Sequence, residues 1–217
     1  RMWVMIPLGV VAVAGAAFLS AYLLSDIERL CEGGANDCTT VAELRRGNPY
    51  DDAIALYDRR DSSLALVGGR ARRFVPVREM PPLVRRAWVA VEDRRFRTHG
   101  GVDALGILRA SVTNLSAAGV ESGASTIPMQ LVRVVWEDRV WKMNRWRRKL
   151  IEVRTAPRLV DELGHDRVLE LYLNGLYLGA GVYGVSAASR HYFGLPLDDL
   201  RPEHVALLVA ITRTPGR

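Results

Sequence analysis

The sequence predicts a mainly α-helical protein with a small N-terminal β element and an N-terminal transmembrane helix. Three observations support this fold class. Met2 to Leu24 contains no charged residue, and a helix of that length at about 1.5 Å per residue spans a hydrocarbon core of about 30 Å. Short apolar runs separated by turn-forming residues occupy 54–77, which is typical of short strands. From residue 81 onward, apolar residues recur at helical spacing.

We expect residues 1–24 to be an uncleaved membrane anchor, because a secretory signal peptide has a shorter apolar core of about 7–15 residues. Residues 25–52 have weak periodicity interrupted by glycine and proline, and are expected to be a juxtamembrane linker. Residues 53–217 then form the functional domain. The two cysteines, Cys31 and Cys38, would close a small disulfide loop in an oxidising compartment or stay reduced in the cytosol.

The β element is expected to be a hairpin or meander made of IALYD (54–58), LALVG (64–68) and RFVPV (73–77). The intervening RRDSS and GRAR segments carry the turn chemistry.

The remaining chain is expected to be helical. Pro81 and Pro82 suit a helix start, and Asp103 suits the N-cap of the next helix. The expected apolar stripes are Val84, Ala87, Trp88 and Val91 in the first helix, and Leu105, Leu108, Val112 and Leu115 in the second. Further helices are expected from Ser125 or Thr126 through Val135, over about 145–163 with Gly164 as the end, and over about 166–173, 186–192 and 202–211.

The charge of the chain favours an anionic partner. Its 217 residues carry a net charge of +6, which suits nucleic acid, anionic lipid or a phosphate-bearing substrate. The basic, aromatic stretch from Trp136 to Lys149 fits either stacked bases or a lipid headgroup layer. Beside a membrane anchor, tryptophan and arginine at this density favour the headgroup layer, so we expect no nucleic-acid partner.

Two glutamates are candidate catalytic residues. Glu92 stands four residues after Trp88 and prolongs the apolar stripe of its helix, where a carboxylate is costly to bury unless it is paired or functional. The alternative is a helix-end glutamate that faces solvent or pairs with Arg95 or His99.

Glu152 follows Arg148 by four residues and Lys149 by three, which places the three side chains on one helix face. Cations grouped in this way would stabilise a departing diphosphate. An ordinary solvent-exposed ion pair is the alternative. The glycine-rich loop GVESGASTIPMQ (119–130) ends in a Ser-Thr helix start, which can present backbone N–H groups to a phosphate. It lacks the lysine of a P-loop.

In this order, the segments resemble glycosyltransferase family 51, the peptidoglycan glycosyltransferases. These occur as monofunctional enzymes and as the polymerase domain of class A penicillin-binding proteins. The resemblance spans about residues 54–215. Its motifs are EDRRFRTHGGVD (92–103), GASTIPMQ (123–130), RKLIE (148–152), RVLELYLN (167–174) and GAGVYGVSAASRHYFG (179–194).

The resemblance implies a lysozyme-like fold and polymerisation of lipid II at the outer face of the bacterial cytoplasmic membrane, with a single membrane pass. Glu92 would be the general base, and Glu152 would assist at the diphosphate, optionally with Mg²⁺ or Mn²⁺. The implied partners are lipid II, the growing glycan strand and other cell-wall synthesis proteins. The implied substrate-binding residues are Asp93, Phe96, His99, Gly123, Ser125, Thr126, Gln130, Arg133, Arg148, Lys149, Asn174, Gly181 and Tyr183.

The sequence departs from the family pattern at several positions. Pro128 and Met129 replace a threonine and a glutamine, Arg133 and His165 stand where lysine is usual, and Pro157 interrupts the helix of Glu152. These departures leave open a degenerate lipid II-binding scaffold as an alternative. A lysozyme-like hydrolase is the rival enzyme, but such enzymes lack the RKLIE and GASTIPMQ elements.

Overall fold

The computed structural model describes residues 41, 43–45, 49–50, 54–57, 63–67, 73–107, 109, 125–140, 142 and 144–213. The chain divides into two compact units, Arg1–Cys38 and Thr39–Arg217, and every described residue belongs to the second. The predicted anchor (1–24), the two cysteines and Gly123 lie outside the described residues. Within them, no helix is long and apolar enough to cross a membrane.

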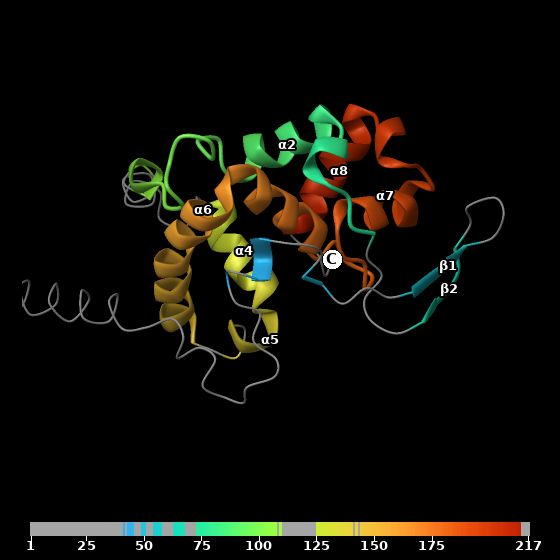
Figure 1. The fold of residues 1–217 in the computed structure, drawn as a ribbon. Helices are drawn as coiled ribbons and strands as arrows, with labels where there is room; N and C mark the ends of the chain where they lie inside the picture. Colours follow the sequence, from blue (N-terminus) through green and yellow to red (C-terminus); the bar gives the residue numbers. More distant parts are fainter. Residues whose placement is uncertain are drawn as a thin grey trace, which may run out of the picture. The chain divides into compact units, whose positions relative to one another are not determined.

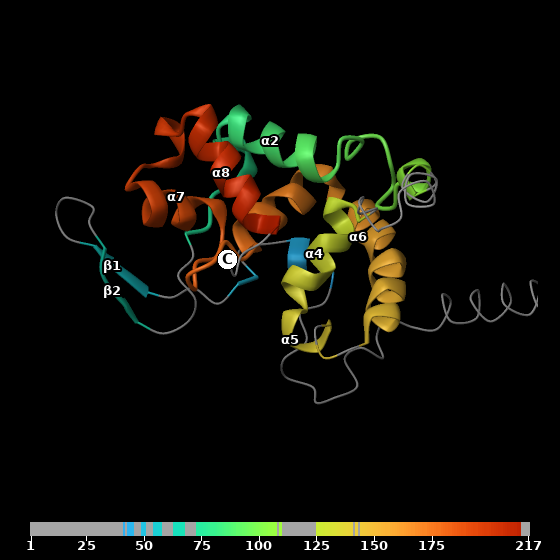
Figure 2. The same ribbon diagram turned by 180° about the vertical axis from the view of Figure 1, so that it is seen from behind.

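The described part of the second unit is mainly helical, as the sequence predicts (Figure 1). The α-helices are α2 (Pro82–Glu92), α4 (Ile127–Val135), α5 (Glu137–Val140), α6 (Arg145–Gly175), α7 (Val185–Phe193) and α8 (Pro202–Arg213). Short 3-10 helices lie at η2 (Glu43–Arg45), η3 (Val77–Glu79) and η4 (Leu197–Asp199). Both ribbon views place α4 beside the N-terminal half of α6 (Figures 1 and 2), and α2 packs against α8.

Helix α2 begins as expected, with Pro82 in its first turn, where a missing N–H costs no hydrogen bond. Val84 and Trp88 are fully buried, so the predicted apolar stripe faces the core at these positions. Val91 is 45% exposed and does not belong to it. The helix ends at Glu92, with Asp93 as its C-cap.

Helix α4 begins at the predicted Ser-Thr start. Thr126 is the N-cap, and its Oγ1 accepts a hydrogen bond of 3.4 Å from the Met129 N–H. Pro128 lies in the first turn, where proline is tolerated, and the Met129 side chain is fully buried. Both departures from the family motif are therefore accommodated by local helix geometry and by core packing.

Helix α6 is interrupted at Gly164, where φ is 75° and ψ is 160°. This confirms the predicted boundary, because the two expected helices, 145–163 and 166–173, lie on either side of it. Pro157 lies inside the first half, and the only non-helical dihedrals of α6 are those of Gly164. The helix therefore continues through Pro157 without a break.

Gly101 packs directly on the helix at Pro157. It adopts φ +101°, and an added Cβ would lie 2.5 Å from the Ala156 carbonyl carbon and 2.6 Å from the Pro157 nitrogen. Only glycine combines this backbone conformation with such a close approach. The EDRRFRTHGG turn is thereby seated on α6.

The β element is smaller than predicted. Strands β1 (Ile54–Tyr57) and β2 (Ser63–Val67) pair antiparallel, with Ile54 opposite Val67 and an irregularity after Leu56. The third strand predicted at 73–77 is wrong, since residues 73–76 form no strand and Val77 opens η3. The backbone of Val75 is bonded instead to a side chain of α6, described below.

The second predicted helix begins where expected. Residues 104–107 and 109 are helical, and Asp103 Oδ1 accepts a hydrogen bond of 2.9 Å from the Gly106 N–H. Leu105 was predicted in the apolar stripe, but it is 58% exposed. It lies in the first turn, and Leu108, Val112 and Leu115 lie outside the residues whose side chains are described.

Candidate functional site

Glu92 is held at the end of α2 by a chain of hydrogen bonds that crosses three helices. Its Oε2 accepts a hydrogen bond of 3.0 Å from Gln130 Nε2 on α4. Gln130 Oε1 in turn accepts one of 3.0 Å from the hydroxyl of Tyr172 on α6. Because Tyr172 donates, the Gln130 amide is oriented with its NH₂ toward Glu92.

Tyr172 is suited to remain a donor. Burial, together with the nearby charge of Glu92, raises its pKa above the ordinary value for tyrosine. The hydroxyl therefore stays protonated throughout the pH range in which a protein of this kind operates. The sequence reasoning missed Tyr172, whose only signal was its place in the RVLELYLN motif.

Glu152 is 1% exposed and lies inside a group of three cations, here called the cationic cluster: Arg133, Arg148 and Lys149. Its Oε1 lies 3.6 Å from Arg133 Nε and 4.0 Å from Arg148 Nε. Its Oε2 lies 3.3 Å from Lys149 Nζ. The solvent-exposed pair considered from the sequence is thus not what the structure shows, because the carboxylate is buried and shared by three partners.

Lys149 connects this cluster to the start of α4. Its Nζ donates a hydrogen bond of 2.7 Å to Ser125 Oγ. Burial lowers the pKa of Lys149, Glu152 opposes that shift, and Arg133 and Arg148 add to it. Because Glu152 neutralises only part of the positive charge around it, Lys149 can still attract an anionic ligand.

Helix α4 brings the two glutamates into one site. Gln130 and Arg133 are three residues apart and therefore share a helix face. Gln130 contacts Glu92, and Arg133 contacts Glu152. The two candidate catalytic residues are consequently linked through adjacent turns of one helix.

Asp93 and His99 form a buried pair that fixes the loop after α2. His99 Nε2 lies 2.9 Å and 3.0 Å from the two Asp93 carboxylate oxygens. Asp93 Oδ2 also accepts a hydrogen bond of 3.0 Å from the Ile127 N–H at the start of α4. His99 Nδ1 accepts from the Gly101 N–H, so the ring proton resides on Nε2 and is donated to Asp93.

Two further residues of this region are interior. The Thr126 hydroxyl donates a hydrogen bond of 2.6 Å to the Gly101 carbonyl, and Phe96 is fully buried against the ring of His165, with centroids 5.1 Å apart. Asp93 and Thr126 thus connect the first two motifs to each other, and His99 and Phe96 lie buried beside them. Their predicted contacts with substrate stay predictions.

Asn174 attaches the segment before α2 to the core. Its Oδ1 accepts a hydrogen bond of 2.8 Å from the Val75 N–H, and its Nδ2 donates bonds of 2.8 Å to the Val75 and Glu170 carbonyls. The side-chain amide therefore supplies both bonds that a neighbouring strand would offer Val75. Glu170, also missed by the sequence reasoning, accepts a hydrogen bond of 2.6 Å from the Val77 N–H.

Gly181 and Tyr183 lie together in the turn before α7. Gly181 has φ +74°, and its N–H donates a hydrogen bond of 3.3 Å to the Tyr177 hydroxyl. The rings of Tyr177 and Tyr183 have centroids 4.9 Å apart, and the two residues form an isolated antiparallel bridge. This aromatic pair is partly exposed.

The structure shows what the two partners suggested for a structural Glu92 contact instead. The partners considered for a merely structural Glu92 were Arg95 and His99. Arg95 instead lies 3.6 Å from Asp103, and His99 is bonded to Asp93.

The donor set at Glu152 does not suit a resident divalent cation. Mg²⁺ and Mn²⁺ favour several oxygen ligands, whereas Glu152 is surrounded by three cationic side chains. Among the residues that the structure describes, no group of three His, Cys, Asp or Glu side chains could hold a metal ion.

Comparison with known proteins agrees with these motifs. A family model described as transglycosylase matches residues 61–217. A Cupriavidus necator protein with a provisional transglycosylase name is 42% identical over 143 residues, which cover 66% of this chain and 60% of that protein.

Two longer relatives are penicillin-binding proteins. Penicillin-binding protein 1A of Neisseria cinerea is 34% identical over 163 residues, or 75% of this chain and 20% of the relative. Penicillin-binding protein 1F of Bacillus subtilis is 38% identical over 161 residues, or 74% of this chain and 22% of the relative. The chain thus spans 60% of one curated relative and about a fifth of the others. The family model covers most of the chain, including both glutamates and all five motifs, and the chain therefore belongs to the transglycosylase family.

Proposed function

We propose that this chain is a peptidoglycan glycosyltransferase that polymerises lipid II into glycan strands with inversion at the anomeric carbon. The observation that supports this most is the contrast between its two linked carboxylates. Glu92 accepts a hydrogen bond from one neutral amide, and Glu152 is buried among three cations. A base and a stabiliser of a departing diphosphate need these two environments.

In the proposed step, Glu92 accepts the proton of the acceptor sugar's 4-hydroxyl. The oxygen attacks the anomeric carbon of the growing strand as the bond from that carbon to the diphosphate oxygen breaks. Undecaprenyl diphosphate leaves with the bonding electrons. The charge that develops on the leaving oxygens lies where the cationic cluster can donate charge-assisted hydrogen bonds.

Each part of the site has a separate duty in this proposal. Gln130 and Tyr172 orient Glu92, and Glu152 holds Arg133, Arg148 and Lys149 in place between turnovers. Ser125 fixes the Lys149 ammonium. No step uses a divalent cation, because the residues around Glu152 are a poor set of ligands for one.

The proposal places the catalytic domain outside the bacterial cytoplasmic membrane, anchored by residues 1–24. The uncharged stretch from Met2 to Leu24 supports this location. So does Trp146, which is 80% exposed beside the basic start of α6, since exposed tryptophan next to arginine suits a headgroup layer. Other cell-wall synthesis proteins are proposed partners on the resemblance alone.

The test is polymerisation of lipid II by the 217-residue chain in detergent, with Glu92→Gln as the comparison and moenomycin as inhibitor. We expect glycan strands that moenomycin suppresses, and a rate about 10²–10⁴-fold lower for Glu92→Gln, which is the typical cost of losing a general base. Lipid II binding by a folded chain that makes no product would instead support the degenerate scaffold. Glycan cleavage without synthesis would support the hydrolase.

A further inference from the structure

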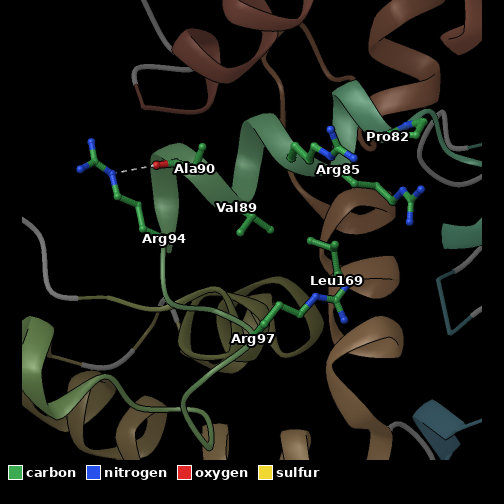
Figure 3. Close-up of a pocket in the computed structure, with 8 residues that line it drawn as sticks. Pro82, Arg85, Val89, Ala90, Arg94, Arg97 and Leu169 are labelled. Atoms are coloured by element: carbon green, nitrogen blue, oxygen red, sulfur yellow. Dashed lines mark hydrogen bonds between the residues drawn. The ribbon is translucent and has the colours of Figure 1, made fainter.

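A second charged site lies along α2, and Arg85, seven residues before Glu92, is its residue nearest to the Glu92 side of the helix. It is a pocket of about 600 Å³, here called the arginine pocket. Arg85, Arg86, Arg94 and Arg97 line it, with Val89 and Leu169 among its apolar residues (Figure 3). At about 100° per residue, the centre of the helix face that lines the pocket lies roughly 90° around the helix from Glu92.

The arginines of the pocket have little negative charge to neutralise them. Arg97 Nη1 lies 2.6 Å from Asp166, and Arg94 Nε donates a hydrogen bond of 3.3 Å to the Ala90 carbonyl. Within the part of the chain that the structure describes, Arg85 and Arg86 make no ion pair. Four guanidinium groups therefore face one carboxylate, which leaves an excess of three positive charges.

Arg85 carries an additional sign of a missing partner. Its Nε is buried and has no hydrogen-bond partner among the described residues, and such a donor costs free energy when it is left unsatisfied. A rotation of the side chain toward an acceptor in the pocket would remove that cost. The pocket wall thus contains a donor that an anion would satisfy.

We propose that the arginine pocket binds a phosphate-bearing anion. Guanidinium groups match phosphate oxygens in a two-pronged geometry, and the excess of positive charge favours an anionic group. Leu169, buried on α6, and Val89 give the pocket an apolar side. Figure 3 shows Arg97 extending from the loop after α2 toward Leu169. A phosphate that carries an apolar group would fill both parts.

Two sources share this chemistry, the headgroup of an anionic lipid and a free phosphate compound. The binding experiment uses the full chain in detergent. It compares inorganic diphosphate, dihexanoyl phosphatidylglycerol and the zwitterionic dihexanoyl phosphatidylcholine, each followed by calorimetric titration at two salt concentrations. The variant is Arg85→Gln with Arg86→Gln, and the matched control is Arg78→Gln with Arg201→Gln, which removes the same charge from exposed positions elsewhere.

We expect phosphatidylglycerol to bind more tightly than phosphatidylcholine, and its affinity to fall about tenfold or more in Arg85→Gln/Arg86→Gln but not in the control. Diphosphate binding with the same dependence on Arg85 and Arg86 would identify a free phosphate as the ligand. The part of the binding that Arg85→Gln/Arg86→Gln weakens must survive Lys149→Ala, since the cationic cluster is a separate anion site. If the double variant does not fold, Arg86→Gln alone, at an exposed position, replaces it.

The proposal is overturned if neither anion binds, or if the control variant and the pocket variant lose affinity equally. Loss of binding with Lys149→Ala but not with the arginine variants would also overturn it. The proposal does not depend on the proposed function, because the binding measurement contains no lipid II.

Discussion

Replacing Tyr172 by phenylalanine tests whether the hydrogen-bond chain sets the orientation of the general base. The substitution removes one hydroxyl, which donates a hydrogen bond of 3.0 Å to Gln130 Oε1, and leaves the ring in place. Only the Glu92 carboxylate, which accepts from Gln130 Nε2, then favours one of the two amide orientations. When the amide turns over, its oxygen faces the Glu92 carboxylate in place of its NH₂ group.

The magnitude follows from the bonds involved. A hydrogen bond to a charged group is worth about 1.5–3 kcal/mol, which corresponds to about 10–150-fold in rate if it is lost entirely. The amide turns over in only part of the molecules, so we expect kcat to fall by about tenfold.

Stability provides the internal control. Tyr172 is 2% exposed, and leaving Gln130 Oε1 without its donor costs about 1–3 kcal/mol. Tyr50→Phe is the matched variant, because the Tyr50 hydroxyl also donates within the interior, to the Leu171 carbonyl at 2.6 Å. Both variants should lower Tm by several degrees, at about 2–4 °C per kcal/mol for a protein of this size. Only Tyr172→Phe should change kcat.

The assay is initial-rate lipid II polymerisation over a pH series, with differential scanning fluorimetry on the same samples. If Tyr172→Phe lowers Tm but keeps the wild-type kcat, Tyr172 has a packing role only and the reasoning fails. If Tyr50→Phe slows the reaction as much as Tyr172→Phe does, the effect is general destabilisation.

Three further predictions concern backbone, loop and charge. Gly101→Ala should destabilise the fold by about 3 kcal/mol or more, because the added Cβ would clash with the Ala156 backbone. Gly181→Ala has no atom within 4 Å of its added Cβ and should cost only the strain of its positive φ, about 1 kcal/mol. Chemical denaturation measures both free energies of unfolding. Asn174→Leu removes both the acceptor of the Val75 N–H and the donor to the Val75 carbonyl. Hydrogen exchange of the Val75 N–H should then accelerate at least about tenfold, a result that unchanged protection would contradict. Because the pKa of Lys149 is lowered, rising pH neutralises it earlier than an ordinary lysine, and the polymerisation rate should decline on the alkaline side. Lys149→Arg should move that decline to higher pH because arginine remains charged. An alkaline limb that does not move would exclude Lys149 as its origin.

Local signals in the sequence were sufficient for the helices because each has its own start or stop. Pro82, Asp103 and Thr126 mark helix beginnings through steric and capping preferences that involve only near neighbours. Gly164 marks a break because its positive φ is a property of one residue. These features require no knowledge of the rest of the fold, and the structure confirms them.

The wrong predictions depend on partners distant in the sequence. RFVPV alternates like a strand, but Val75 pairs with Asn174, which lies 99 residues later in the chain. Leu105 has helical spacing, but its exposure depends on what packs over the first turn of its helix. Periodicity reports which residues share a face and cannot report whether another element covers that face.

The candidate site shows the same division. The motif resemblance identified both glutamates, Gln130 and the cationic residues. It did not reveal that Arg133 of α4 lies closer to Glu152 than Arg148 does, because no spacing rule connects residues on different helices. Tyr172 was missed for the same reason, since its function arises only where α6 meets α4.

The break at Gly164 has a mechanical consequence for the site. Glu152 belongs to the half of α6 before the break, and Tyr172, which orients Gln130 toward Glu92, belongs to the half after it. The two halves are joined at Gly164, so the orientation of Glu92 relative to Glu152 depends on two backbone torsion angles, the φ and ψ of that residue. Neighbouring atoms leave room for a side chain at Gly164, because an added Cβ would meet nothing within 4 Å. The positive φ of Gly164 disfavours an L residue, so a D-alanine introduced at position 164 by chemical ligation would preserve the alignment that L-alanine would disturb.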